Sequence, residues 1–216
     1  MISRRSTILM SPVFVLVAGQ LTIRLLAPVW GEWSWVPFSI LYYLLLGILI
    51  SISGGMKQVR QWLCSSQGHR AWAILACLVP ALMTLPIFIP NWRLLLLPRI
   101  GFWTLAFILI NPLIEEFYWR GTLLDVTGAW PRGLSVSYAV LGFTLHHLWI
   151  GVIAAAGRHP SSLAGPMLMG FVWSVVYKAT GSLRWPILGH FLANLFSLTV
   201  PVLLNLYIPP GIQGVS

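Results

Sequence analysis

Apolar stretches of about 20 residues, the length that crosses a bilayer as a helix, recur along almost the whole chain. Of its 216 residues, 58% are hydrophobic and only 8% are charged, against about 25% charged in a typical soluble domain. The connections between the stretches are short and leave no room for a soluble domain. The sequence therefore predicts an all-α fold, a polytopic transmembrane bundle of about seven helices. The predicted spans lie near residues 8–28, 36–54, 72–90, 100–117, 134–156, 163–180 and 186–208.

The lysines and arginines between these spans are distributed unequally over the two sides of the predicted bundle. One side collects Arg4, Arg5, Lys57, Arg60, Arg70, Arg132 and Arg184, with Arg120 and Lys178 close by, and the other has Arg93, Arg99 and Arg158. Short loops rich in lysine and arginine stay in the cytoplasm. We therefore expect an integral, multi-pass protein of the cell (inner) membrane, with its N-terminus in the cytoplasm and its C-terminus outside.

The net charge of +9 also bears on the partners of the chain. Its basic residues are scattered between spans rather than clustered, so we expect them to contact the headgroups of the lipid bilayer and no nucleic acid. Cys64 and Cys77 have neither metal-ligand spacing nor a disulfide framework around them.

The fourth predicted span contains two of the four acidic residues of the chain. Ionisable side chains inside a bilayer are costly and are functional candidates by default. Arg120 follows Glu116 by four residues, the spacing at which a carboxylate and a guanidinium meet on one helix face. Since adjacent helical residues point about 100° apart, we expect Glu115 and Glu116 not to face one point, which leaves Glu115 free to act as a base. The alternative is a solvated ion cluster at a helix end. Pro112 removes a helix hydrogen bond just upstream and is expected to kink the helix.

The fifth and seventh predicted spans place further polar side chains in apolar surroundings. Phe143 and His147 share a helix face, whereas His146 is turned about 100° away and is expected to pack or to donate to a neighbouring helix. His190 and Asn194 again lie four residues apart, and an asparagine beside a histidine is a neutral donor suited to a developing oxyanion. The alternative is a set of helix-packing histidines and interhelical hydrogen bonds, which are worth about 1 kcal/mol in membrane bundles.

Taken in order, these motifs resemble those of the CPBP family, which comprises the CAAX prenyl endopeptidases of the Rce1 type and the bacterial Abi, or bacteriocin-processing, proteins. The matching motifs are Glu115-Glu116-x-x-x-Arg120, Phe143-x-x-x-His147 and His190-x-x-x-Asn194. The resemblance covers about half of the chain. It divides the chain into variable N-terminal transmembrane helices over 1–99, a catalytic core over 100–208 and a short tail over 209–216.

The resemblance implies an intramembrane endopeptidase whose motif helices converge on a cavity open to the cytoplasm. Glu115 would activate the attacking water, and His147 would share that water. His190 and Asn194 would stabilise the oxyanion, while Glu116 and Arg120 would order the site or receive part of the substrate. The substrate would be a membrane-embedded or lipid-anchored peptide or protein, and the resemblance implies no particular oligomeric state.

The family has been described both as metalloproteases and as metal-free glutamate peptidases. Glu115, His147 and His190 would make a two-histidine, one-carboxylate zinc site. Zinc-bound histidines usually donate their other ring nitrogen to a carboxylate or carbonyl. The remaining acidic residues, Asp125 and Glu32, lie in predicted loops, so we expect no cofactor.

Two other functions fit a polar cavity in a membrane bundle. The first is a non-catalytic protein that binds a peptide, as in bacteriocin immunity, and that does not need Glu115 as a base. The second is a small proton-coupled transporter, which predicts inverted repeats with paired broken helices. The sequence shows no such correspondence between its halves.

Overall fold

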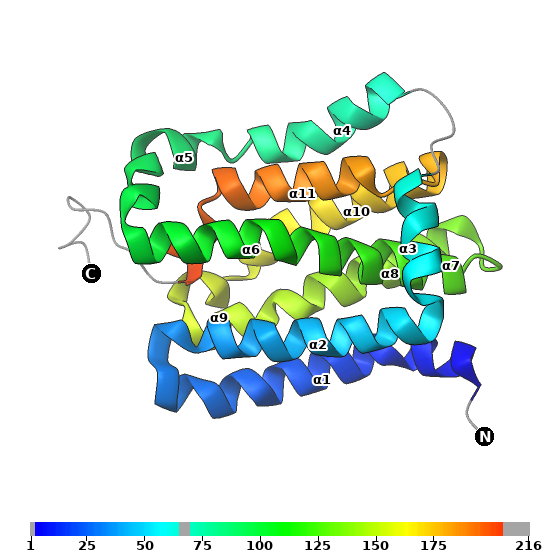
Figure 1. Cartoon of the computed structure of the whole chain (residues 1–216), viewed down its shortest axis with the longest axis horizontal. Helices are drawn as coiled ribbons and strands as arrows, with labels where there is room; N and C mark the ends of the chain where they lie inside the picture. The colour runs from blue at the N-terminus through cyan, green and yellow to red at the C-terminus, as the bar shows by residue number, and fades with distance from the viewer. Residues whose placement is uncertain (1–2, 65–69, 205–216) are drawn as a thin grey trace.

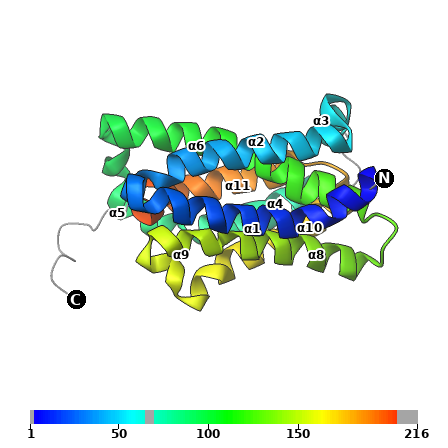
Figure 2. The same cartoon turned by 90° about the horizontal axis from the view of Figure 1, so that it is seen from below.

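The computed structural model describes residues 3–64 and 70–204, and within these ranges the chain forms helices and turns without any β-strand. Its long helices lie side by side along the long axis of the molecule (Figures 1 and 2). They are α1 (Arg4–Trp30), α2 (Trp35–Ser53), α4 (Arg70–Leu82), α6 (Pro98–Glu116), α8 (Arg132–His146), α10 (Ala164–Thr180) and α11 (Arg184–Phe196).

Shorter elements join the long helices at the two ends of this bundle (Figure 1). The end that holds the N-terminus, called the α3 end below, contains α3 (Gly55–Cys64) and α7 (Leu123–Val126), and the π-helix η3 (Phe117–Thr122) leads from α6 into α7. The opposite end is called the α9 end. Its elements are η1 (Gly31–Ser34), α5 (Leu85–Asn91), η2 (Trp92–Leu96), η4 (His147–Trp149), α9 (Ile150–Ile153), η5 (Ala155–Arg158), η6 (Pro160–Leu163) and the π-helix η7 (Thr199–Leu204).

The prediction of an all-α membrane bundle is confirmed, and each predicted span overlaps at least one helix. Among the described residues, the segments long and apolar enough to cross a membrane are Arg4–Trp30, Trp35–Ser53, Pro98–Val126 and Arg132–Ile153, with one bent pair, Ala71–Leu82 and Leu85–Leu96. The helices α10 and α11, of 17 and 13 residues, are shorter than a full crossing but lie inside the same bundle. Residues 205–208 of the seventh predicted span and the tail over 209–216 lie outside the described residues.

The third predicted span is broken rather than continuous. Its two halves meet at an angle of 53°. Pro86 stands in the first turn of α5, where it can donate no hydrogen bond back to the preceding helix. The break turns α5 across the α9 end of the bundle, and Thr84 and Ile87 thereby line the central cavity.

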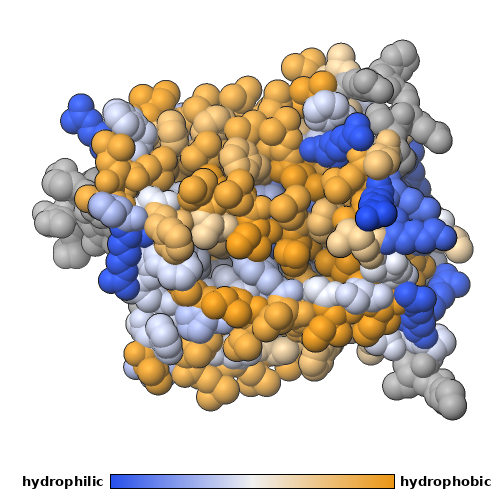
Figure 3. All heavy atoms as spheres, in the orientation of Figure 1, coloured by the Kyte–Doolittle hydropathy of each residue, from blue (hydrophilic) through white to orange (hydrophobic). Residues whose placement is uncertain are grey.

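The outer surface of the bundle suits a lipid environment around its middle and water at its ends. Large apolar side chains such as Phe14, Leu21, Leu44 and Phe102 are more than half exposed, an apolar area far beyond that of a soluble monomer. Hydrophilic residues gather at the α3 end, with few at the α9 end on the face shown in Figure 3.

Candidate active site

Glu116 and Arg120 form a fully buried ion pair, as their four-residue spacing predicts. The Arg120 Nη1 donates to Glu116 Oε1 over 3.0 Å, and the two residues are only 1% and 0% exposed. Glu116 ends α6 and Arg120 lies in η3, a π-helical turn of the kind often found at functional sites. The guanidinium also stacks on the ring of Phe143, with Cζ 4.0 Å from the ring centroid. The pair therefore ties α6 to α8.

His190 of α11 lies between the two adjacent glutamates. Its Nδ1 is 2.8 Å from Glu116 Oε1, and its Nε2 is 3.6 Å from Glu115 Oε2. The two glutamates therefore share one partner, which their separation on the helix did not predict, although only Glu115 faces the cavity. An imidazole has one nitrogen on each edge, and each carboxylate lies beside a different nitrogen, so the ring spans the 100° between the two backbone positions. Trp173 stacks on that ring at 4.7 Å between centroids and fixes its plane.

Glu115 is held by partners that the sequence analysis missed. Tyr42 of α2 donates to its Oε1 over 2.8 Å, and Asn111, one turn earlier on α6, donates to its Oε2 over 3.1 Å. Trp119 in turn donates to the Tyr42 hydroxyl. The four-residue spacing of Asn111 and Glu115 could have predicted their contact on one helix face. Nothing in the sequence pairs Tyr42 with Glu115. Glu115 thus lacks a cation at the next helical turn, as predicted, but is not free of hydrogen bonds.

His147 presents one ring nitrogen to the interior of the bundle. Its Nδ1 lies 2.8 Å from the backbone oxygen of Phe143. A carbonyl can only accept, so Nδ1 carries the proton, and neutral His147 keeps a lone pair on Nε2. His146 packs, as expected: it is buried and stacks on Tyr42 with 4.2 Å between ring centroids.

Asn194 carries an unused hydrogen-bond donor. Its Oδ1 accepts from the Thr199 hydroxyl over 3.4 Å. Its Nδ2 is buried and has no hydrogen-bond partner among the described residues. Buried donors are nearly always satisfied, so an unsatisfied one beside a cavity marks a position suited to an acceptor on a ligand.

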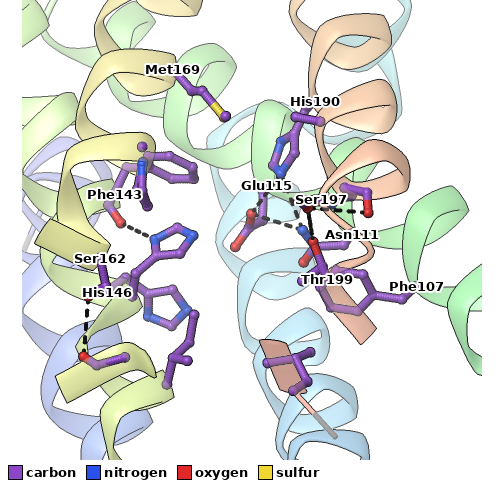
Figure 4. Close-up of a pocket in the computed structure, with 18 of the residues that line it drawn as sticks. Phe107, Asn111, Glu115, Phe143, His146, Ser162, Met169, His190, Ser197 and Thr199 are labelled. Carbon is purple, nitrogen blue, oxygen red and sulfur yellow. Dashed lines mark hydrogen bonds and ion pairs between the residues drawn. The ribbon is translucent and has the colours of Figure 1, made fainter. Parts of the chain in front are cut away.

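A cavity of about 440 Å³ joins these groups. Four of the six predicted site residues line it, namely Glu115, His147, His190 and Asn194, whereas Glu116 and Arg120 do not. Figure 4 shows Glu115 and His190 on one side of an open space, with Phe143 and His146 across it. Much of the remaining lining is apolar, from Phe38, Phe107, Trp149, Ile150 and Met169.

The cavity runs toward the α9 end of the bundle. Glu115 and His190, 3% and 4% exposed, form its floor, and the lining residues Ile87 of α5 and Ser161 of η6 are exposed at its mouth. The resemblance implied a cavity open to the cytoplasm, whereas the basic residues place the α9 end outside. These two expectations cannot both hold in this structure.

Glu115, His147 and His190 are the side chains that would bind a zinc ion. The argument that neither histidine has an outer partner is wrong, because Glu116 binds Nδ1 of His190 and the Phe143 carbonyl binds Nδ1 of His147. However, within the described residues no three side chains of histidine, cysteine, aspartate or glutamate form a group that could hold a metal ion.

Residues 97–196 match the model of a family described as Type II CAAX prenyl endopeptidase Rce1-like. Over this region, 100 of its 216 residues, the chain is similar to the Rce1-like family. The matched region contains all six predicted site residues, whereas Tyr42 lies outside it. No curated protein and no solved structure matches the chain. The Rce1-like family supports, in general terms, an intramembrane endopeptidase that acts on a protein or peptide in the membrane.

The buried ion pair gives a test of stability. We expect Glu116→Gln and Arg120→Ala each to lower the free energy of unfolding by about 3–5 kcal/mol, because each leaves a buried charge without its partner. The double variant should lose clearly less than the sum of the two, since the residues act as one pair. Unfolding in detergent measures all three, with Glu115→Gln as the matched control that keeps the ion pair. Additive losses in the double variant would contradict the pairing.

Proposed function

We propose that this protein is an intramembrane endopeptidase that hydrolyses a peptide bond of a membrane-embedded or lipid-anchored substrate, with Glu115 as the general base for water and without a metal cofactor. One observation carries the proposal. A buried carboxylate, an imidazole with a free lone pair and an amide with a free N–H all line one cavity in the membrane bundle. These are the base, the water-positioning group and the oxyanion donor that peptide hydrolysis needs.

Glu115 is the base because of how it is held. The donors Tyr42 and Asn111 fix the carboxylate at the cavity floor, and both are neutral side chains that do not compete with it for a proton from water. A water molecule between Glu115 and His147 would give one proton to the carboxylate and direct its other hydrogen to the Nε2 lone pair of the imidazole. Its oxygen then forms the new bond to the scissile carbonyl carbon.

Asn194 and His190 face the oxygen that becomes negative in this step. The buried Nδ2–H of Asn194 supplies one hydrogen bond. His190 donates through Nδ1 to Glu116, so it can donate from Nε2 only as an imidazolium. In that form Nε2 would donate the second hydrogen bond to this oxygen. When the C–N bond breaks, the proton held by Glu115 passes to the leaving nitrogen.

Glu116 and Arg120 then serve to position His190 rather than to receive the substrate. Both are buried behind the cavity wall and neither contributes to its lining. Glu116 fixes the Nδ1 side of the imidazole, and the stacked Trp173 fixes its plane. Loss of either member of the ion pair would misplace Nε2 relative to the substrate.

The cavity itself favours proteolysis over transport. Its lining residues come from the middle of the bundle and from the α9 end, and a carrier would need a path to both ends. A non-catalytic peptide-binding protein would have the same cavity, but it would not need an unpaired donor and a free imidazole lone pair placed around a carboxylate.

Variants of the cavity residues separate catalysis from binding. Glu115→Gln should abolish turnover while leaving substrate bound and the protein folded, because the amide keeps the shape but cannot take a proton. His147→Ala should lose about 10²–10⁴-fold in kcat, the usual contribution of an acid–base group, and the matched variant His146→Ala should keep a substantial fraction. The first assay is cleavage of a farnesylated peptide ending in C-a-a-X and of transmembrane peptides in proteoliposomes. Full activity of Glu115→Gln would contradict the mechanism.

Metal dependence is tested on the wild type. Because the three donors do not converge on one point, extended dialysis against a chelator should leave the cleavage rate unchanged, and metal analysis should find no stoichiometric zinc. Loss of activity on chelation that zinc alone restores would recast Glu115, His147 and His190 as ligands.

A further inference from the structure

We infer that the active-site cavity receives its substrate from the non-cytoplasmic side of the membrane, so that the substrate is a membrane-anchored protein whose cleavage site lies on that side. This inference rests on the proposed protease function, and it concerns the route and class of the substrate. Three features of the structure support it independently of the chemistry at Glu115.

The first feature is the position of the cavity mouth. Ile87 and Ser161, the exposed lining residues, belong to α5 and η6 at the α9 end. Half-buried lining residues surround them at the same end, namely Thr84, Gly157, Ser162, Gly165 and Pro166. No described residue of α3, of α7 or of the segment 127–131 lines the cavity. A substrate therefore enters over the elements of the α9 end.

The second feature is a closed floor toward the α3 end. Between Glu115 and the α3 end, the chain is tightly packed. Tyr118, Trp119, Leu123 and Leu124 are each 0% exposed.

Beyond these residues, Asp125 of α7 joins three elements. It accepts hydrogen bonds from Gln58 and Trp62 of α3 and from Tyr177 of α10, over 3.0, 2.9 and 2.7 Å. A second hollow at this end, lined by Arg4, Arg5 and Asp125 among others, shares no lining residue with the active-site cavity. Entry from the α3 end would have to break this packing.

The third feature is the charge difference between the two ends. The exposed basic residues of the α3 end are Arg4, Arg5, Lys57, Arg60, Arg132 and Arg184. Those of the α9 end are Arg93, Arg99 and Arg158, and Arg24 is also exposed on the part of α1 nearer that end. Because the α3 end carries the larger number of basic residues, the positive-inside rule places it in the cytoplasm. The cavity mouth at the α9 end then faces the other side.

The lining also bears on which part of a substrate fits. Hydroxyl groups of Thr84, Ser161, Ser162, Ser197 and Thr199 line the outer part, together with apolar rings deeper in. Among the described residues, no lysine or arginine lines the cavity, so a free C-terminal carboxylate would meet neither an ammonium nor a guanidinium group there. This lining suits the backbone of an uncharged, apolar segment within a chain better than a chain terminus.

Thiol labelling from each side of the membrane tests this inference without any need for turnover. Cys64→Ser serves as background, because the remaining Cys77 is buried. The probes are Ser161→Cys at the mouth and Met169→Cys inside the cavity, with Lys57→Cys on α3 as the matched control. Each is expressed in a bacterial host and treated with a small, charged, membrane-impermeant methanethiosulfonate, on intact spheroplasts and on inverted vesicles.

We expect Ser161→Cys and Met169→Cys to react in spheroplasts and Lys57→Cys to react only in inverted vesicles. Labelling of Met169→Cys from the cytoplasmic side alone would overturn the inference, as would labelling of Lys57→Cys in spheroplasts. Ser161 is exposed in η6 and, among the described residues, its side chain hydrogen-bonds only to the exposed His159, so Ser161→Cys reports the side of the mouth even where Met169→Cys fails to fold. Since labelling is independent of catalysis, an inactive wild type would refute the proposed function while leaving this result readable.

Discussion

Glu116 and Arg120 are 0% and 1% exposed inside a membrane bundle, and the geometry of the site depends on their ion pair. Removing two charges from water costs several kcal/mol each, which only close pairing and further hydrogen bonds offset. Here the pair is completed by His190 on the carboxylate and by the ring of Phe143 under the guanidinium. Because these contacts fix α6, η3, α8 and α11 against one another, the second carboxylate, Glu115, is left at the cavity floor with only neutral donors and one imidazole edge around it.

The sequence allowed prediction of the bundle and of those contacts that are local in the chain. Apolar runs located each long helix, and the four-residue spacing identified the Glu116–Arg120 pair, because a helix imposes these relations wherever it forms. Contacts between helices were not predictable in this way. Tyr42 reaches Glu115 across 73 positions, and the Glu116 partner of His190 lies 74 positions away. Neither spacing has a local signature, so the sequence predicts neither the hydrogen bonds of Glu115 nor the carboxylate partner of His190.

Because contacts between distant segments cannot be predicted from the sequence, the sequence also does not predict at which end of the bundle the cavity opens. The side on which a cavity opens depends on how end segments such as α5 and η6 fold over the bundle, and helix periodicity carries no information about them. The break at Pro86 and the Asp125 cluster, both features of connecting segments, open one end of the bundle and close the other. The charge asymmetry of the whole chain is the observation from which we propose that the open end faces the outside.

The central claim is that Glu115 activates water directly rather than attacking the substrate itself. The most direct measurement is a single turnover in H₂¹⁸O with enzyme in excess over substrate, followed by mass analysis of the new C-terminal carboxylate. Direct attack of water places one ¹⁸O in that carboxylate during the first turnover and leaves the side chain of Glu115 unlabelled. A first-turnover product without ¹⁸O, together with label in Glu115, would show an acyl-enzyme intermediate and would contradict the account.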